Sequence, residues 1–307
     1  MKTATLTNGI RTVIEKVPFF HSVSAGIWVK AGSRYETPEE NGISHFIEHM
    51  LFKGTSAKDA RCIAATIDNI GGTLNAFTAK ECTCFYVHVA DEHLDTGLEL
   101  LADMLKNSTL DPYELKKEQG VVLEEISMVE DTPDDLVHEL AASGYYGSAS
   151  LGQTILGPRE RVSAFCRDDL RRYMAKRYVT GNIVLSVAGN LDEKKTLDML
   201  EKYFASGIPV APESPDIPAK TGENTKKCVF CEKNNEQMNM CLTYGGPGSL
   251  DADFYPLTVF NAAFGGSMSS RLFQTVREQN GLTYSIFSYA STYNDCGTYS
   301  VYAGMNP

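Results

Sequence analysis

His45-Phe46-Ile47-Glu48-His49 places two imidazoles four residues apart, with a carboxylate between them. On an α-helix, positions i and i+4 are neighbours on one face, and position i+3 lies beside them. Neutral imidazole nitrogens are good metal ligands. A carboxylate near a metal ion but not bound to it can serve as a general base. The stretch therefore predicts a helix that holds one metal ion together with the base that works beside it.

The order His-x-x-Glu-His is the inverted form of a common zinc-protease motif. A histidine on a partly apolar helix is more often a core residue than a ligand, and short motifs also occur by chance. Here, however, only 6 histidines occur in 307 residues, and two of them stand at ligand spacing. Their neighbours are largely apolar, so burying two histidines and Glu48 without a partner would be costly. We therefore favour a metal helix, with Ser44 expected as its N-terminal cap and Gly54 as its stop.

A catalytic zinc ion usually has three protein ligands, so a third donor is expected on another element. Residues 111–130 form a predicted helix with a proline at an early position. Within it, Glu118 and Glu125 share one helical stripe with valines. Acidic residues on a helix usually face solvent, but these two alternate with apolar residues. We predict Glu125 as the third ligand and Glu118 as a supporting carboxylate, with Glu124, rotated by about 100°, as the alternative ligand.

Three stretches together make the chain resemble the pitrilysin/insulinase family of inverted zinc peptidases. The likeness is strongest to its short branch, which includes the mitochondrial processing peptidase beta subunit and bacterial homologues. The matching stretches are residues 42–55, 72–78 and 118–126, and the resemblance runs over essentially the whole chain. It implies a metalloendopeptidase with one Zn²⁺ per chain. The implied roles are zinc ligands for His45, His49 and Glu125, catalytic base for Glu48 and supporting carboxylate for Glu118.

The same resemblance implies that residues 74–78 form an edge strand on which the substrate lies as an added strand. Main-chain hydrogen bonds of this kind hold a peptide regardless of its side chains. Asn75, Ala76 and Phe77 are the predicted substrate-binding residues of this strand. The expected substrates are short, unstructured peptides enclosed between two domains.

The fold implied by the resemblance is α+β, with two related domains that each have a mixed, largely antiparallel sheet and helices on one face. Residues 207–226 are rich in proline and lack periodicity, which is typical of a linker. We therefore predict a catalytic domain over 1–206 and a partial second domain over 227–307. Besides the metal helix, we expect strands near 3–17, 22–30, 72–78, 82–89 and 183–188, and helices near 58–70, 92–107, 111–130, 134–143, 163–175 and 192–204.

An internal repeat follows the linker. Residues 237–245 resemble 22–32, and residues 281–284 resemble 72–75. The positions of the two histidines and the glutamate are taken in the second copy by Leu257, Phe260 and Asn261, so no second metal site is predicted.

The family resemblance also gives the second copy a part in substrate binding, through Arg277 and Tyr284. A guanidinium and a phenol can both donate hydrogen bonds to carbonyl groups of a bound peptide.

The second copy lacks a counterpart of residues 90–206, because Val89 matches roughly Ala303 and the sequence stops at Pro307. We therefore expect an incomplete second domain whose sheet leaves apolar surface exposed. The same gap keeps an alternative open. The chain is then a non-catalytic assembly or regulatory subunit of the same fold, or an inactive truncated fragment.

Composition sets the remaining expectations. A chain of 307 residues, 43% of them hydrophobic, fits a globular protein of about two domains. A net charge of −11 argues against nucleic acid and anionic membranes as partners. The first residues are too short and polar for a signal peptide, and the eight cysteines lack the spacing of a secreted scaffold. We expect a cytoplasmic enzyme without a membrane partner that acts on peptides, as a homodimer or as a heterodimer with a related subunit.

Overall fold

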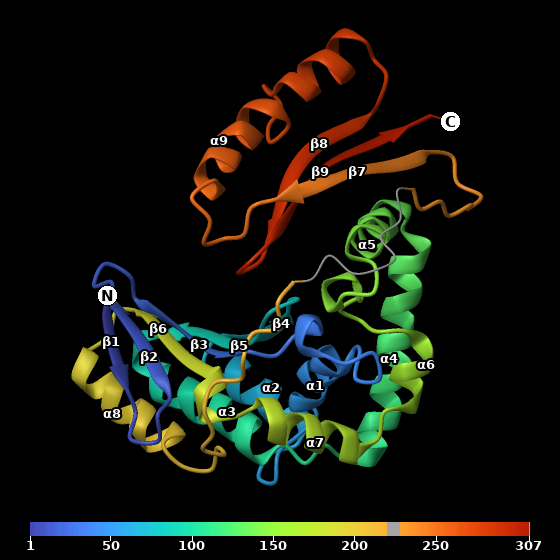
Figure 1. Cartoon of the computed structure of the whole chain (residues 1–307). Helices are drawn as coiled ribbons and strands as arrows, with labels where there is room; N and C mark the ends of the chain where they lie inside the picture. The colour runs from blue at the N-terminus through green and yellow to red at the C-terminus, as the bar shows by residue number, and fades with distance from the viewer. Residues whose placement is uncertain (220–227, 307) are drawn as a thin grey trace. The chain divides into compact units, whose positions relative to one another are not determined.

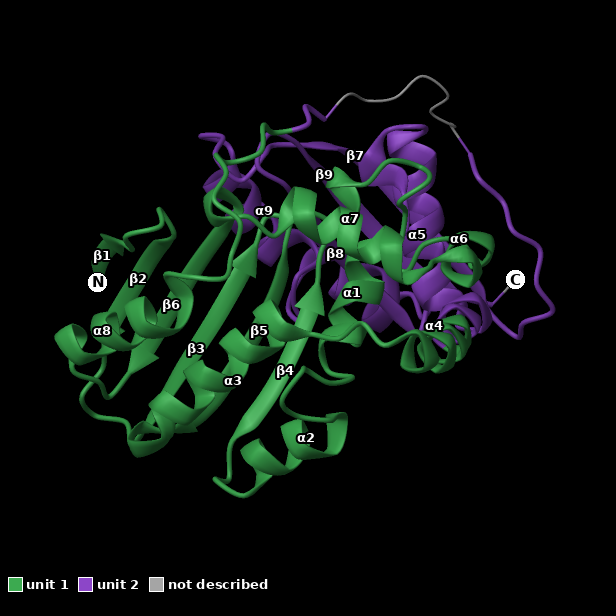
Figure 2. Ribbon diagram, turned by 90° about the horizontal axis from the view of Figure 1, so that it is seen from below, with its two compact units in different colours: residues 1–124, 155–216 green, residues 125–154, 217–307 purple. Residues whose placement is uncertain are grey.

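The computed structural model describes residues 1–219 and 228–306, which form two compact units. Unit 1 comprises residues 1–124 and 155–216, and unit 2 comprises residues 125–154 and 217–307 (Figure 2). The predicted domains, residues 1–206 and 227–307, were placed from the linker and the internal repeat in the sequence, and they stay a prediction. The units instead follow packing, which groups residues 125–154 with the second half of the chain.

Unit 1 is built on one six-stranded sheet. The strand order is β1-β2-β6-β3-β5-β4, and all neighbours are antiparallel except β2 and β6. This mixed, largely antiparallel sheet confirms the predicted α+β class. The strands are β1 (Lys2–Thr5), β2 (Arg11–Lys16), β3 (Ser22–Val29), β4 (Thr73–Thr78), β5 (Thr83–Ala90) and β6 (Ile183–Gly189).

Helices cover one face of this sheet. Alternate residues of β3, among them Val23 and Ile27, are buried, whereas Trp28 is exposed on the opposite face. Figure 2 shows α2, α3 and α8 lying across the strands. The helices are α1 (Ile43–Leu51), α2 (Ala60–Asp68), α3 (Leu94–Asn107), α4 (Pro112–Asp131), α6 (Arg159–Ala164), α7 (Arg167–Arg177) and α8 (Glu193–Phe204). The boundary between the units at residues 124 and 125 falls inside α4.

One predicted helix, over residues 163–175, is wrong in its extent. The structure has two helices there, α6 and α7, which are separated at Phe165 and Cys166. The N-terminus of α7 is closed by a capping box, in which the Asp169 carboxylate accepts from the backbone N–H of Cys166 at 2.9 Å. Because α7 begins anew at this cap, α6 and α7 do not form one continuous helix.

Residues 207–216 of the predicted linker lie against unit 1. The backbone N–H of Gly181 donates to the carbonyl of Ala211, and Lys30 forms ion pairs with Glu213 and Asp216 at 2.8 and 2.7 Å. Neither a helix nor a strand occurs over residues 207–219. Residues 220–226 of the predicted linker lie outside the described residues.

Unit 2 contains a three-stranded antiparallel sheet in the order β7-β9-β8 (Figure 1). This order matches β3-β5-β4 of unit 1, as the predicted repeat requires. However, residues 282–284 precede β8, whereas their predicted counterparts 73–75 lie within β4, so the two copies differ in where this strand starts. The strands are β7 (Met238–Gly246), β8 (Ser285–Thr292) and β9 (Gly297–Met305).

Two helices pack on this sheet, α5 (Pro133–Tyr146) and α9 (Phe254–Phe264). His138 of α5 shares a 2.6 Å hydrogen bond with the hydroxyl of Tyr289. Asn261 of α9, the residue in the place of the second histidine, accepts from the hydroxyl of Ser288 at 2.8 Å. The second copy thus uses this position for a structural hydrogen bond. A short π-helix covers Phe273–Gln279.

Candidate metal centre

The metal helix, α1, begins one residue earlier than its predicted cap. Gly42 is the N-terminal cap, in the left-handed conformation with φ of 95°. Ser44 lies inside the helix, so its prediction as the cap is wrong. Its hydroxyl instead pairs with that of Tyr173 at 2.8 Å. A side chain at position 42 would also meet the carbonyl oxygen of Leu156 at 2.6 Å, which favours glycine there.

The free N–H groups at the start of α1 are bound by a carboxylate that the sequence did not single out. Glu36 is 3% exposed and accepts from the backbone N–H of Gly42 at 2.8 Å and of Ser44 at 2.9 Å. It also accepts from the side-chain amide of Asn41 at 3.1 Å. A carboxylate at this end of a helix satisfies orphan donors and opposes the positive end of the helix dipole.

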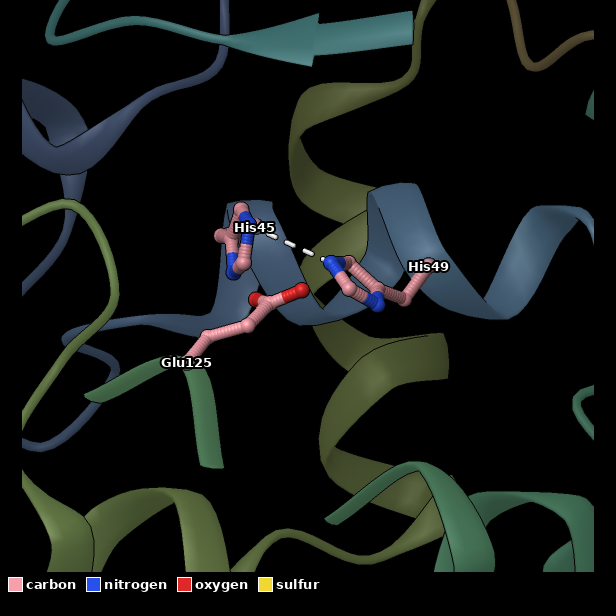
Figure 3. A group of neighbouring side chains, drawn as sticks. All are labelled: His45, His49 and Glu125. Carbon is pink, nitrogen blue, oxygen red and sulfur yellow. Dashed lines mark hydrogen bonds between the residues drawn. The ribbon is translucent and has the colours of Figure 1, made fainter. Parts of the chain in front are cut away.

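His45 and His49 lie on the same face of α1, as their spacing predicts. Their Nε2 atoms are 3.2 Å apart, and both rings point toward the Glu125 carboxylate of α4 (Figure 3). One ligand atom from each of the three residues lies within 4.8 Å of the other two. The structure thus brings together the three predicted zinc ligands. Glu124, the alternative ligand, is exposed to solvent.

Glu118 lies behind His49, as a supporting carboxylate would. One of its oxygens is 2.8 Å from His49 Nδ1, and the other pairs with Lys53 at 2.6 Å. The contact to Nδ1 leaves Nε2 as the nitrogen turned toward His45 and Glu125. Carboxylates commonly orient metal-binding histidines in this way.

The protonation of these groups suits metal binding. Burial, with a contribution from the neighbouring His49, lowers the pKa of His45 to about 4. His45 is therefore neutral at pH 7, as a metal ligand must be. Burial acts to raise the pKa of Glu118, but hydrogen bonds from His49 and Lys53 outweigh it and bring that pKa below its usual value.

A zinc ion fits this donor set. Two nitrogen ligands of a tetrahedral zinc ion stand roughly 3.3 Å apart when each Zn–N bond is about 2.0 Å. The observed 3.2 Å between the two Nε2 atoms agrees with that spacing. Two imidazoles and one carboxylate are also a protein ligand set used by catalytic zinc sites.

Glu48 lies on α1 between the two histidines in sequence, but it is not a member of the three-residue ligand group. Its carboxylate accepts from the hydroxyl of Thr78, the last residue of β4, at 2.5 Å. The sequence singled out neither Thr78 nor Glu36 as a functional residue. Thr78 is the last residue of the stretch 72–78, which resembles the family, whereas Glu36 lies outside all three matching stretches. Only Thr78 could therefore have been noticed from the sequence.

The predicted substrate strand, β4, lies at one end of the strand order in unit 1. Asn75 and Phe77 are exposed, and the backbone N–H of Ala76 donates to the Asn75 side chain at 2.8 Å. Phe77 also packs edge-on against Trp28, with ring centroids 5.7 Å apart. An edge strand with these groups has the geometry that strand addition requires.

The last two predicted substrate-binding residues, Arg277 and Tyr284, lie in unit 2 and contact each other. The Arg277 guanidinium lies 5.4 Å from the centre of the Tyr284 ring, which is itself largely exposed. Their contact with a substrate stays a prediction.

This fold and donor set define a class, proteins with a candidate metal site on an inverted His-x-x-Glu-His helix. The chain belongs to the insulinase family, peptidase family M16: residues 11–159 match that family and residues 164–307 match the peptidase M16 inactive domain.

Relatives in several bacteria share the sequence. The uncharacterized zinc protease YmxG of Bacillus subtilis is 49% identical, over 99% of this chain and 73% of the relative. The uncharacterized zinc protease SCO5738 of Streptomyces coelicolor is 40% identical, over 100% of this chain and 68% of the relative. The chain is thus shorter than both relatives.

Solved structures share the fold. A protease from Helicobacter pylori superimposes with a TM-score of 0.92 at 23% identity, over 100% of this chain and 75% of that one. A peptidase M16 inactive domain from Pseudomonas fluorescens gives a TM-score of 0.93 at 19% identity, over 99% and 74% of the two chains. Within the described residues, no helix is both long and apolar enough to cross a membrane.

Proposed function

We propose that the chain is a zinc-dependent endopeptidase that hydrolyses short, unstructured peptides. The observation that carries the proposal is the convergence of His45, His49 and Glu125 within 4.8 Å, with Glu48 on the same helix as the two histidines. His45, His49 and Glu125 would hold one Zn²⁺ per chain. Zinc, when bound, polarises a scissile carbonyl and makes a nearby water more acidic.

The protein's own groups then carry the proton. Glu48 takes it from the attacking water and passes it to the departing amine, so no covalent intermediate with the protein is needed. Glu118 holds the ring of His49 in the tautomer that presents Nε2. The general base alone contributes roughly 10²- to 10⁴-fold to the rate of such reactions.

Substrate binding in this proposal uses β4 as the edge to which a peptide adds as a strand. Asn75 and Ala76 contact its backbone, and Phe77 contacts a side chain on the exposed face. Arg277 and Tyr284 donate hydrogen bonds to its carbonyls. Enclosure between two domains, part of the same proposal, selects peptides by length and lack of structure. We also propose that the protein acts in the cytoplasm, as a homodimer or a heterodimer with a related subunit.

The test is hydrolysis of an internally quenched, unstructured peptide by the zinc-loaded chain and by its Glu48→Gln variant. We expect cleavage that is lost in the variant and in the presence of a chelator, while the variant still binds one zinc ion. Glu124→Gln is a matched control because it changes an exposed carboxylate of α4.

A second function has one observation in its favour, the match of residues 164–307 to a domain described as inactive. In that case the chain is a non-catalytic subunit. No hydrolysis by the zinc-loaded chain alone, together with hydrolysis by an added related subunit that Glu48→Gln in this chain leaves unchanged, would favour this alternative over the enzyme.

A further inference from the structure

The proposed base, Glu48, is held by a residue of the proposed substrate strand. The hydroxyl of Thr78 donates to the Glu48 carboxylate at 2.5 Å, and both side chains are half-buried. Both residues belong to unit 1, Glu48 on α1 and Thr78 at the end of β4. A hydrogen bond to a charged acceptor is stronger than one between neutral groups.

The neighbouring hydroxyl of Thr83 does not donate to Thr78. Thr83, which pairs with Thr78 in the β4–β5 register, lies 3.3 Å away and is fully buried. The Thr83 hydroxyl donates its own proton to the carbonyl of Ala31 at 3.0 Å. Because a hydroxyl has only one proton to donate, Thr83 cannot also donate to Thr78. The Thr78 proton goes to the Glu48 carboxylate, which is a closer and stronger acceptor than the Thr83 hydroxyl.

The turn that follows Thr78 is anchored to the core of unit 1. Arg34 is 2% exposed and pairs with Glu81 at 2.6 Å, and its backbone N–H donates to the carbonyl of Lys80 at 2.8 Å. A side chain at Gly32 would meet the carbonyl oxygen of Ala79 at 2.3 Å, so the chain there approaches this turn closely. These contacts fix the end of β4, and with it the hydroxyl of Thr78.

We propose that Thr78 is a positioning residue that holds the Glu48 carboxylate in the orientation needed for proton transfer, so that one strand both receives the peptide and aligns the base. This inference rests on the proposed peptidase function. Proton transfer depends on placement of the base within a fraction of an ångström. Loss of the hydroxyl should therefore slow the reaction without weakening peptide binding.

The experiment compares Thr78→Val, which removes the hydroxyl at nearly constant shape, with Thr78→Ser, which retains it. Valine suits a strand, so the fold should be retained. We expect kcat of Thr78→Val to fall about tenfold, which is one step of about 1.4 kcal/mol in barrier height. KM should stay within about twofold, because strand addition is unchanged. Thr78→Ser should recover most of the rate.

Thr3→Val is the matched control, because Thr3 lies on β1, at the other end of the same sheet, with an exposed side chain. It should cleave like the parent chain. A Thr78→Val variant with an unchanged kcat would overturn the positioning role. So would a loss of rate that comes from a raised KM or from lost zinc.

A measurement without activity tests the contact itself. Urea unfolding of the metal-free parent, Thr78→Val, Glu48→Ala and the double variant forms a cycle, followed by the fluorescence of Trp28, the only tryptophan. The two changes should be non-additive, and additivity would overturn the inference. If the parent chain cleaves no peptide, the proposed function fails together with the catalytic role of Thr78. Cleavage by the parent with unchanged kcat in Thr78→Val removes the positioning role alone.

Discussion

Glu36 should be a main support of the metal helix, although it binds no metal in our proposal. It is 3% exposed, and its carboxylate accepts three hydrogen bonds from N–H groups at the start of α1. Replacing it with alanine removes every acceptor at once. The backbone N–H groups of Gly42 and Ser44 and the side-chain amide of Asn41 would then lose this buried acceptor.

The cost follows from these contacts. A buried donor left without a partner costs about 1 to 3 kcal/mol. For three such donors the lower end of this range applies to each, because water can enter the space that the shorter side chain leaves and bind them. We expect Glu36→Ala to destabilise unit 1 by about 3 kcal/mol. Glu36→Gln keeps one acceptor oxygen, so it should cost about 1 to 2 kcal/mol.

Urea unfolding followed by tryptophan fluorescence reports on unit 1, because the single tryptophan, Trp28, lies on β3 of that unit. Glu39→Ala is the control, since Glu39 is an exposed carboxylate three residues further along the same loop. Its effect should stay within about 0.5 kcal/mol. The reasoning would be refuted if Glu36→Ala and Glu36→Gln were each within that same margin of the parent.

Further predictions concern the metal site, pH and the surface of unit 2. Glu125→Gln should weaken zinc binding at least about 100-fold in a competition assay, while Glu124→Gln leaves it unchanged, and equal effects would contradict the ligand assignment. Burial raises the pKa of Glu36 above 4.5, so its folded form binds a proton more tightly. The proton-linked part of its contribution to stability is therefore present below pH 4.5 and is lost as the pH rises through the raised pKa, a slope that Glu36→Gln should remove in unfolding measurements from pH 4.5 to 7. Val259 and Phe260 of α9 are 71% and 49% exposed, so the chain should bind a hydrophobic dye, and Val259→Lys should reduce that binding; a parent chain that binds no dye would contradict this.

Spacing within each of two helices was enough to predict which three side chains the structure brings together. His45 and His49 share a face because any helix puts them there, and the stripe on residues 111–130 favoured Glu125 over its neighbour. The sequence could not show that residues 125–154 pack with the second half of the chain, because that depends on contacts between distant segments. Glu36 escaped notice for a similar reason. Its role depends on a loop that turns back to the start of α1, and the periodicity of helices and strands in a sequence gives no information about such a turn.

The contacts around α1 imply a further result, that removing zinc should abolish cleavage but leave the fold intact. Each important group of the helix is held by the protein itself: its N-terminus by Glu36, Glu48 by Thr78, and His49 by Glu118. Small structural zinc domains differ, because metal binding supplies their folding energy. Here unit 1 has an extensive buried core of its own.

Chelation should therefore leave the far-ultraviolet circular dichroism and the Trp28 fluorescence of the protein nearly unchanged. Returning zinc should restore activity without a refolding step. A large loss of helical signal on chelation would show that the metal, and not the protein's own contacts, organises α1. The Glu36→Ala variant offers a sharper comparison, because a helix with a weakened N-terminus should depend more on the metal than the parent does. If chelation affects the parent and this variant equally, Glu36 does not preorganise the site.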